Sequence, residues 1–255
     1  MRRRVKSLVV LAIVICVVCP FLYTFGAPIL TIWTLRHRAS EFPVVNKTPV
    51  ALTDLSVSRG PGKKFTYLGY DFEVPWTDID EGKSKLTGTR VVIAFDSEKA
   101  MTFAKFPPDE FLDGIASTMK STPDKLRAAF GDQIRSDYAF KKLILYTTPG
   151  RITFLTPWRQ CISTLMLVMF KVVMVPAPDI DLFSVQTDEY KGFQFGDPKK
   201  RPRRMGVELY SDEGMLELYF SQKENGQAPG ISQSDINRVI QSVHKTENKE
   251  SVLAK

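Results

Sequence analysis

The hydrophobic pattern of the chain opens with a long apolar run. A basic start, Met1–Lys6, precedes Leu8–Phe25, a stretch without a charged residue. About 18 uncharged apolar residues can cross the hydrocarbon core of a bilayer, and a helix satisfies its own backbone there. Apolar character resumes at Ala27–Trp33, and tryptophan suits a membrane interface. The pattern therefore predicts an anchor within residues 1–35 that contacts lipid through residues 8–33.

Flanking charge predicts the orientation of this anchor. Lys and Arg accumulate on the cytoplasmic side of a membrane segment. Four cations precede the apolar run and two follow it, which predicts a single-pass protein with a cytoplasmic N-terminus and an extracytoplasmic domain. These cations are Arg2, Arg3, Arg4 and Lys6 before the run, and Arg36 and Arg38 after it.

A cleaved signal peptide is the alternative interpretation of the same run. Cleavage requires small residues just before the cut. Gly26-Ala27 lies between Phe25 and Pro28, which makes a poor cleavage site. Val17-Val18-Cys19 lacks the small residue that a lipoprotein signal places before its cysteine. Both observations favour an anchor that stays attached.

Beyond the anchor, the pattern divides the chain into three parts. Residues 36–54 contain Pro43 and Pro49 and show neither helical nor strand periodicity, which predicts an extended linker. Residues 55–245 carry regular periodicity and predict one extracytoplasmic domain. Residues 246–255 form a tail of mixed charge that we expect to be flexible.

Strand patterns occupy both ends of the domain. Leu55–Ser58 predicts a short strand, and Phe65–Trp76 holds two strand-like patches whose phase changes at Leu68-Gly69, where a bulge would fit. Alternation around residues 96–99 predicts a hairpin of Arg90–Phe95 and Met101–Phe106. Alternation that is typical of antiparallel strands with one covered face returns later. Its segments are Phe183–Thr187, Tyr190–Phe195, Met205–Tyr210 and Met215–Phe220.

Helical spacing fills the middle and the end of the domain. Three helices are predicted over residues 107–119, 122–131 and 137–145, and a fourth over residues 156–175. The short apolar run in residues 137–145 is also compatible with a strand. The closing helix has the clearest start, because Ser232 is followed three residues later by Asp235, a near capping box. Its predicted inward stripe consists of Ile236, Val239, Ile240 and Val243.

These elements predict an α+β fold, an antiparallel sheet packed with helices and preceded by one N-terminal transmembrane helix. The segment around Cys161–Phe170 is apolar on both sides, so it belongs in a core or in lipid. Its uncharged part is too short to span a bilayer and is interrupted by Lys171, which favours a core helix over a second membrane segment. Cys161 is then expected to be a buried packing thiol.

Charge and cysteine content narrow the function classes. The formal net charge is +7, but residues 1–40 hold six Lys or Arg and no acid, which leaves 29 basic and 28 acidic residues elsewhere. A nearly neutral domain gives no support for nucleic-acid binding. Cys161 is the only cysteine outside the anchor, so the domain has no internal disulfide. Cys16 and Cys19 have a redox-like spacing, but an apolar helix would shield their thiols. We therefore expect no cofactor.

Candidate chemistry is sparse in this sequence. No Gly-x-Ser-x-Gly elbow is present. A carboxylate-pair hydrolase of the cell envelope, using Asp78, Asp80, Asp179 or Asp181, remains as the alternative function. No metal site is predicted. The best candidate contact for an anionic partner, which could be lipid head groups, an acidic protein or a wall polymer, is a basic loop that consists of Lys199, Lys200, Arg201, Arg203 and Arg204.

Two motifs resemble the PsbP-like fold. They are an early aromatic strand that ends in Phe72-Glu-Val-Pro-Trp76, and a closing helix that contains Asp235-Ile-Asn-Arg-Val-Ile-Gln-Ser242. The resemblance covers roughly residues 55–245, although Pro107–Val175 is longer than that family usually carries. It implies a sandwich and a binding or assembly role without catalysis. The whole chain also resembles bacterial proteins with one N-terminal membrane span. We therefore expect a membrane-anchored binding or scaffolding domain that is not an enzyme.

Overall fold

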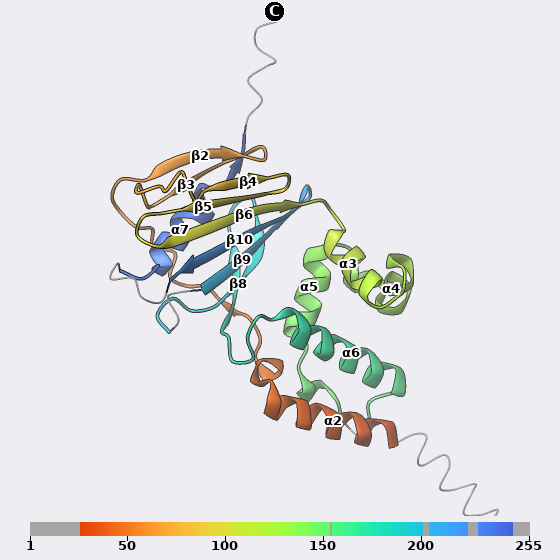
Figure 1. Cartoon of the computed structure of the whole chain (residues 1–255). Helices are drawn as coiled ribbons and strands as arrows, with labels where there is room; N and C mark the ends of the chain where they lie inside the picture. The colour runs from red at the N-terminus through yellow and green to blue at the C-terminus, as the bar shows by residue number, and fades with distance from the viewer. Residues whose placement is uncertain (1–25, 154, 201–203, 224–228, 247–255) are drawn as a thin grey trace, which may run out of the picture. The chain divides into compact units, whose positions relative to one another are not determined.

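A computed structural model describes residues 26–153, 155–200, 204–223 and 229–246 (Figure 1). The predicted anchor run Leu8–Phe25 lies outside these residues. Among the described helices, none is both long enough and apolar enough to cross a bilayer. The chain divides into two compact units. The helical unit combines residues 1–48 with 142–179, and the sheet unit combines residues 49–141 with 180–255.

The sheet unit is built on an eight-stranded sheet in the order β1-β7-β8-β9-β10-β6-β5-β4. Every neighbouring pair is antiparallel except β1 and β7, which run parallel. The α+β class and the predicted hairpin of Arg90–Phe95 and Met101–Phe106 are thereby confirmed. The strands are β1 (Val50–Ala51), β4 (Lys85–Thr87), β5 (Arg90–Ala94), β6 (Lys99–Phe106), β7 (Leu182–Gln186), β8 (Lys191–Phe195), β9 (Arg204–Ser211) and β10 (Gly214–Gln222).

A second sheet of three strands has the order β11-β3-β2. Its strands are β2 (Lys63–Tyr67), β3 (Tyr70–Val74) and β11 (His244–Lys245). Leu68 and Gly69 both have positive φ, at 56° and 81°, and form the two-residue turn of a β2–β3 hairpin. The bulge expected there is therefore wrong, because the chain reverses instead of kinking. Leu55–Ser58, expected to be a strand, is irregular.

Helix α7 (Gln233–Ser242) completes the core of the sheet unit. The predicted capping box of Ser232 and Asp235 is present, and the predicted inward stripe is buried. The apolar face of α7 packs with the inner residues of β3, β5, β6, β9 and β10 in one hydrophobic cluster. Phe72 of the small sheet stacks on Phe103 of the large sheet with ring centroids 4.8 Å apart. Helix α7 and the small sheet therefore cover one face of the large sheet (Figure 1).

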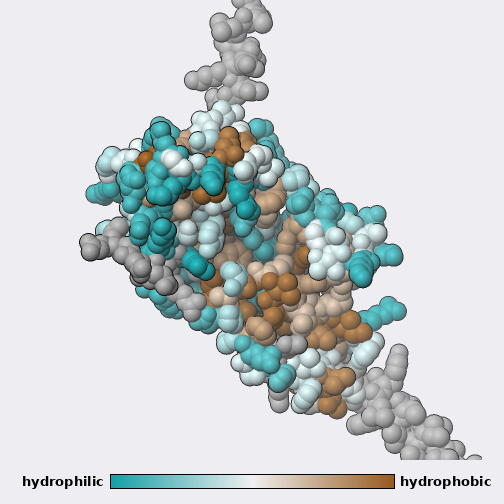
Figure 2. Space-filling view, in the orientation of Figure 1, coloured by the Kyte–Doolittle hydropathy of each residue, from teal (hydrophilic) through white to brown (hydrophobic). Residues whose placement is uncertain are grey.

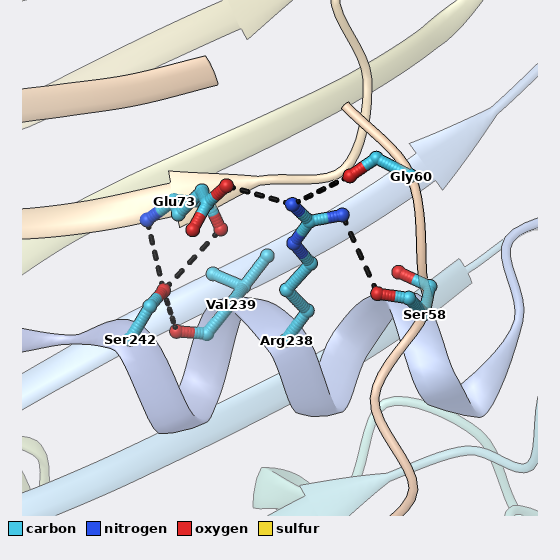
Figure 3. A network of polar contacts seen from close by, with 6 residues as sticks. All are labelled: Ser58, Gly60, Glu73, Arg238, Val239 and Ser242. Atoms are coloured by element: carbon cyan, nitrogen blue, oxygen red, sulfur yellow. Dashed lines mark hydrogen bonds and ion pairs between the residues drawn. The ribbon is translucent and has the colours of Figure 1, made fainter. Parts of the chain in front are cut away.

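A polar network locks α7 to the small sheet (Figure 3). Arg238 forms an ion pair with Glu73 of β3 and donates to the carbonyl oxygens of Ser58 and Gly60. The hydroxyl of Ser242 accepts a hydrogen bond from the Glu73 amide at 2.8 Å. The irregular segment before β2 is thus held by side chains of α7, which explains why it is ordered without being a strand.

Two helices and the start of a third follow β6 in the sheet unit. Helix α3 (Glu110–Thr118) and helix α4 (Pro123–Phe130) are joined to the start of α5 (Asp137–Tyr146). The Thr122 side chain caps α4 and Pro123 occupies its first turn, as the sequence predicts. Phe140 packs edge-on against Phe111 and also contacts Phe130. These aromatic contacts fix the start of α5 against α3 and α4.

Regular elements take the place of the extended linker that the sequence predicts. Residues 36–54 are not extended, because α2 (Ala27–Glu41) is followed by a 3-10 turn, η2 (Pro43–Asn46), and then by β1. Helix α2 packs against α6 (Trp158–Met174), with a further 3-10 turn, η4 (Pro149–Arg151), beside them. Leu35 and Thr31 are buried in this packing. The prolines that suggested a linker instead start η2 and precede β1.

Helix α6 forms as predicted, but its burial differs from a uniform core helix. Cys161 is buried, as expected, and so is Lys171. The Lys171 ammonium donates to the carbonyl oxygens of Lys47, Leu145 and Thr147, which satisfy a buried cation without a carboxylate partner among the described contacts. Val173, in contrast, is 77% exposed. The charge that was expected to interrupt the apolar stretch is therefore interior, while part of the apolar stretch faces outward.

Candidate binding cleft

The sheet unit contains an open cleft of about 740 Å³ at one end of its strands. Four structural pieces surround it: the β6–α3 connection, the start of α5, the β7–β8 turn and the β9–β10 turn. Tyr70 of β3 and Lys245 of β11 complete its wall. Clefts of this size are typical of ligand sites in proteins, so this cleft is a candidate binding site.

Tyrosines form the floor of the cleft. Tyr70, Tyr190 and Tyr210 are buried, and Tyr138 is half-buried. Burial raises the pKa of all three buried hydroxyls, and neighbouring carboxylates add to the effect at Tyr70 and Tyr210. The three hydroxyls therefore stay protonated at physiological pH and can donate hydrogen bonds.

The hydroxyl of Tyr210 belongs to a buried polar chain. It donates to Glu208 Oε2 at 2.8 Å, and Glu208 Oε1 accepts from Lys141 Nζ at 2.9 Å. The Lys141 ammonium also lies over the rings of Phe111 and Phe195, at 4.8 and 5.3 Å from their centroids. Because Tyr210, Glu208 and Lys141 all have partners, this hydrogen-bond network holds α5 to β9 and fixes the Tyr210 ring. It offers no free catalytic group.

Asp137 has a similar positioning role. Its two carboxylate oxygens accept the amides of Phe111 and Leu112 at 3.3 and 3.0 Å, at the start of α3. Burial raises the pKa of this carboxyl, and the nearby charges of Asp109 and Asp113 raise it further. Since the side chain is buried and both oxygens are engaged, Asp137 joins the first turns of α3 and α5 at the cleft wall.

The rim of the cleft is charged and mainly acidic. Its carboxylates outnumber its cations by five to three. Lys245 pairs with Glu213 at 2.5 Å, and Asp109 pairs with Arg127 at 3.0 Å. Asp188 and Asp212 project from exposed positions in the two strand turns. The rim carboxylates are Asp109, Asp188, Glu189, Asp212 and Glu213, and the rim cations are Arg135, Lys191 and Lys245.

The carboxylates that the sequence offered for a hydrolase lie elsewhere. Asp78 accepts the Ser97 amide at 2.7 Å, and Asp80 pairs with Lys83 inside one loop. Asp181 pairs with Lys200 at 2.8 Å, and the carbonyl oxygen of Asp179 accepts from Lys47. None of the four lines the cleft. Asp78, Asp80 and Asp181 stabilise loops through their side chains, and Asp179 does so through its backbone carbonyl.

The basic loop is only partly described. Lys199 and Lys200 are exposed, and so is Arg204 at the start of β9. Lys200 is paired with Asp181, and Asp197 accepts the Lys199 amide at 2.9 Å. Arg201 and Arg203 lie outside the described residues. The predicted anionic contact at Lys199–Arg204 therefore stays a prediction.

Potential metal ligands in the described part of the chain do not cluster. No group of three or more His, Cys, Asp or Glu side chains there has a geometry that could hold a metal ion. His37 and His244 do not line the cleft. His244 lies in β11, just after the end of α7, and faces Asp71 at 3.7 Å.

Sequence reasoning missed the cleft because its residues come from turns and strand ends. One signal was nevertheless present. Both turns at the rim carry an Asp-Glu pair, in Thr187-Asp-Glu-Tyr190 and Ser211-Asp-Glu-Gly214. Two acidic turns between adjacent strands of one sheet are expected at the same sheet end. The buried tyrosines gave no such signal, because aromatic residues are ordinary in strands.

No known protein family, curated protein sequence or solved structure matches this chain. The resemblance to the PsbP-like fold therefore stays a prediction from two motifs and an order of elements. A function has to be argued from the cleft and from the surfaces of the two units themselves.

Proposed function

We propose that the chain is a membrane-anchored, extracytoplasmic binding protein, and that its cleft takes a cationic segment of a partner. The observation that carries the proposal is the combination of an acidic rim with a floor of tyrosines. Lys and Arg side chains form charge-assisted hydrogen bonds with carboxylates, and the tyrosines of the floor offer apolar edges for the stems of these side chains. A cleft of about 740 Å³ accommodates a few such side chains.

The site supports binding more than catalysis. Asp137, the buried carboxyl of the cleft, is held by two backbone amides, and Glu208 is held by Lys141 and Tyr210. A general acid or base needs a carboxyl that can reach the substrate. The exposed carboxylates, in contrast, sit on turns at the rim, where they attract and orient a charged partner.

The membrane part of the proposal rests on the sequence. The uncharged run Leu8–Phe25 precedes α2 directly, and four of the six cations around it lie on the N-terminal side. This arrangement supports an N-terminus in the cytoplasm and a sheet unit outside it. A tethered binding domain needs no catalytic group of its own, because it acts by holding a partner near the membrane.

The test is a binding titration of the full chain in detergent micelles with short peptides. A lysine-rich peptide should bind, and a glutamate-rich peptide of equal length should not. Asp188→Asn with Asp212→Asn removes two rim charges from exposed turn positions and should weaken lysine-peptide binding by about tenfold, since two exposed charge contacts of about 0.7 kcal/mol each sum to about 1.4 kcal/mol.

The matched control is Asp96→Asn with Asp124→Asn, which removes the same charge from exposed positions outside the cleft. This variant should bind as the parent does. Equal weakening by both double variants would show that only net charge attracts the peptide. Absence of binding by the parent at low salt would refute the cleft as a cation site.

A further inference from the structure

Exposed apolar side chains gather on the helical unit. Among the residues that the structure describes, this unit holds fewer than a third of the total but seven of the thirteen exposed large apolar side chains. Figure 2 shows apolar surface over α6 and over the N-terminal end of α2. The seven residues are Ile29, Leu30, Trp33, Leu155, Trp158, Ile162 and Val173.

The exposed side chains of α6 form one stripe. Trp158, Ile162 and Val173 are exposed, and residues between them on the same helical face are half-buried rather than covered. Positions separated by three, four or seven residues share one face of a helix. The stripe therefore runs the length of α6 as Trp158, Ile162, Leu165, Met166, Met169 and Val173. The opposite face carries the buried Cys161, Val168 and Lys171.

Helix α2 presents a matching apolar face. Ile29, Leu30 and Trp33 are exposed one turn apart, while Thr31 and Leu35 on the other side are buried. Trp33 is 66% exposed and stacks on His37, with ring centroids 6.1 Å apart. This face begins four residues after the uncharged run Leu8–Phe25. The exposed apolar surface is thus continuous in sequence with the segment predicted to lie in lipid.

The charge of the helical unit complements an anionic membrane. Besides the buried Lys171, residues 26–48 and 142–179 contain six Lys or Arg and only two acidic residues. The sheet unit, in contrast, contains 24 basic and 26 acidic residues. The net positive charge of the chain therefore belongs to the unit that carries the apolar faces. Each Lys or Arg near an anionic bilayer surface contributes about 1 kcal/mol of attraction.

We propose that the helical unit is seated in the interface of the bilayer, with the apolar faces of α2 and α6 and the Leu155 side chain dipped among the lipid head groups. The inference rests on the anchor of the proposed function and extends lipid contact to residues 155–173, far from that anchor in sequence. Trp33 and Trp158 lie at the interface, where tryptophan is most stable. Amphipathic helices bind this region by the same combination of apolar burial and cationic attraction.

The experiment reconstitutes the full chain into vesicles that contain brominated lipid, which quenches nearby tryptophan. A variant that keeps only Trp158, with Trp33→Phe and Trp76→Phe, reports on α6. The matched control keeps only Trp76, which is buried in the core of the sheet unit. Trp158 fluorescence should fall at least twofold relative to unbrominated vesicles of the same composition, and Trp76 fluorescence should stay unchanged.

A second pair of variants tests the apolar stripe itself. Ile162→Glu with Val173→Glu places charge on exposed positions of α6 and should abolish Trp158 quenching. Leu55→Glu with Leu86→Glu makes the same chemical change on exposed residues of the sheet unit and should leave the quenching intact. Inclusion of anionic lipid should increase Trp158 quenching relative to neutral vesicles, because the unit is cationic.

The experiment distinguishes a wrong interfacial position of the helical unit from a wrong membrane anchor. If the parent chain floats with the vesicles but shows no Trp158 quenching, the anchor is retained and the proposed interfacial position is wrong. Concentration-dependent crosslinking through α6 together with absent quenching would assign this face to a second copy of the chain. If the chain does not float with vesicles at all, both the anchor and the interfacial position of the helical unit are wrong.

Discussion

Arg238 Nη2 lies 2.7 Å from Glu73 Oε1 and joins the last helix of the chain to a strand 165 residues earlier. Both side chains are largely buried, and the same guanidinium holds the carbonyl oxygens of Ser58 and Gly60. The close fit leaves no room at Gly62, where an added Cβ would lie 2.5 Å from Glu73 Oε1. One arginine therefore organises the segment before β2, the small sheet and α7 together.

The first prediction concerns this ion pair. Arg238→Ala should lower the free energy of unfolding by about 2–4 kcal/mol, because it leaves a partly buried carboxylate and two carbonyl groups without their donor. Chemical denaturation measures the change. Arg135→Ala is the control, since Arg135 and Asp132 form an ion pair of two well-exposed side chains and should contribute less than about 1 kcal/mol. Equal losses in both variants would contradict the anchoring role of Arg238.

The second prediction concerns the approach of β8 to β9. A Cβ at Gly192 would lie 1.9 Å from the Glu208 carbonyl oxygen, so Gly192→Ala must push the two strands apart. Gly114 lies in α3 with open space around it, and Gly114→Ala should stabilise the protein by about 0.5–1 kcal/mol. Melting temperatures should therefore move in opposite directions. A neutral Gly192→Ala would show that β8 and β9 are less closely packed.

Periodicity predicted most of the regular structure of the sheet unit. Alternation in Met205–Tyr210 and Met215–Phe220 placed two central strands because one face of each is fully buried, and burial imposes a period of two. Ser232 and Asp235 located the start of α7 because capping is a local interaction. These signals arise between residues that are close in sequence, so they can be recognised in a single sequence.

Contacts between residues that are distant in sequence leave no such pattern. Lys171 looked like an interruption of an apolar stretch, because its three carbonyl partners lie 24 residues or more away in sequence. The cleft likewise depends on turns that approach only after the sheet has formed. The helix at Ala27–Glu41 was missed at its C-terminal half, since the packing of α2 against α6 and not its own pattern stabilises it there.

The third prediction concerns Cys161. The thiol is buried on α6, its Sγ lies 3.5 Å from the Thr156 carbonyl oxygen, and burial raises its pKa. A low thiolate fraction and lack of access both slow alkylation. In a Cys16→Ser, Cys19→Ser background, labelling of the folded chain should be at least a hundredfold slower than in denaturant. Rapid labelling under native conditions would mean that α6 separates readily from the rest of the helical unit.

The fourth prediction concerns the docking of α7. Ile240→Asp places a carboxylate in the cluster that α7 forms with the large sheet, where it has no cationic partner among the described contacts. Such a burial costs several kcal/mol, so the sheet unit should unfold or lose most of its stability. Leu86→Asp, which makes an apolar-to-Asp change at an exposed side chain of β4, is the control and should change stability by about 1 kcal/mol or less. An unchanged melting curve for Ile240→Asp would show that α7 does not dock as described.

The last prediction is a pH dependence that originates at Lys171. Burial, with a smaller contribution from the charge of Arg151, lowers the pKa of this ammonium from 10.5 to about 8. Between these two values the unfolded chain holds a proton that the folded chain has released. The unfolded state then binds more protons, so stability rises as the pH increases through 8. Below pH 8 both states are protonated and the contribution is constant.

The measurement compares the parent with Lys171→Met at pH 7 and at pH 9.5, using denaturation of the full chain followed by tryptophan fluorescence. Loss of the three hydrogen bonds lowers the stability of Lys171→Met at both pH values, but it also removes this titration. The parent should therefore gain about 2 kcal/mol relative to the variant at the higher pH, since one pKa unit corresponds to about 1.4 kcal/mol. Lys142→Met, an exposed lysine on α5, should keep the pH dependence of the parent. Parallel curves for the parent and Lys171→Met would show that the Lys171 ammonium is not buried in solution.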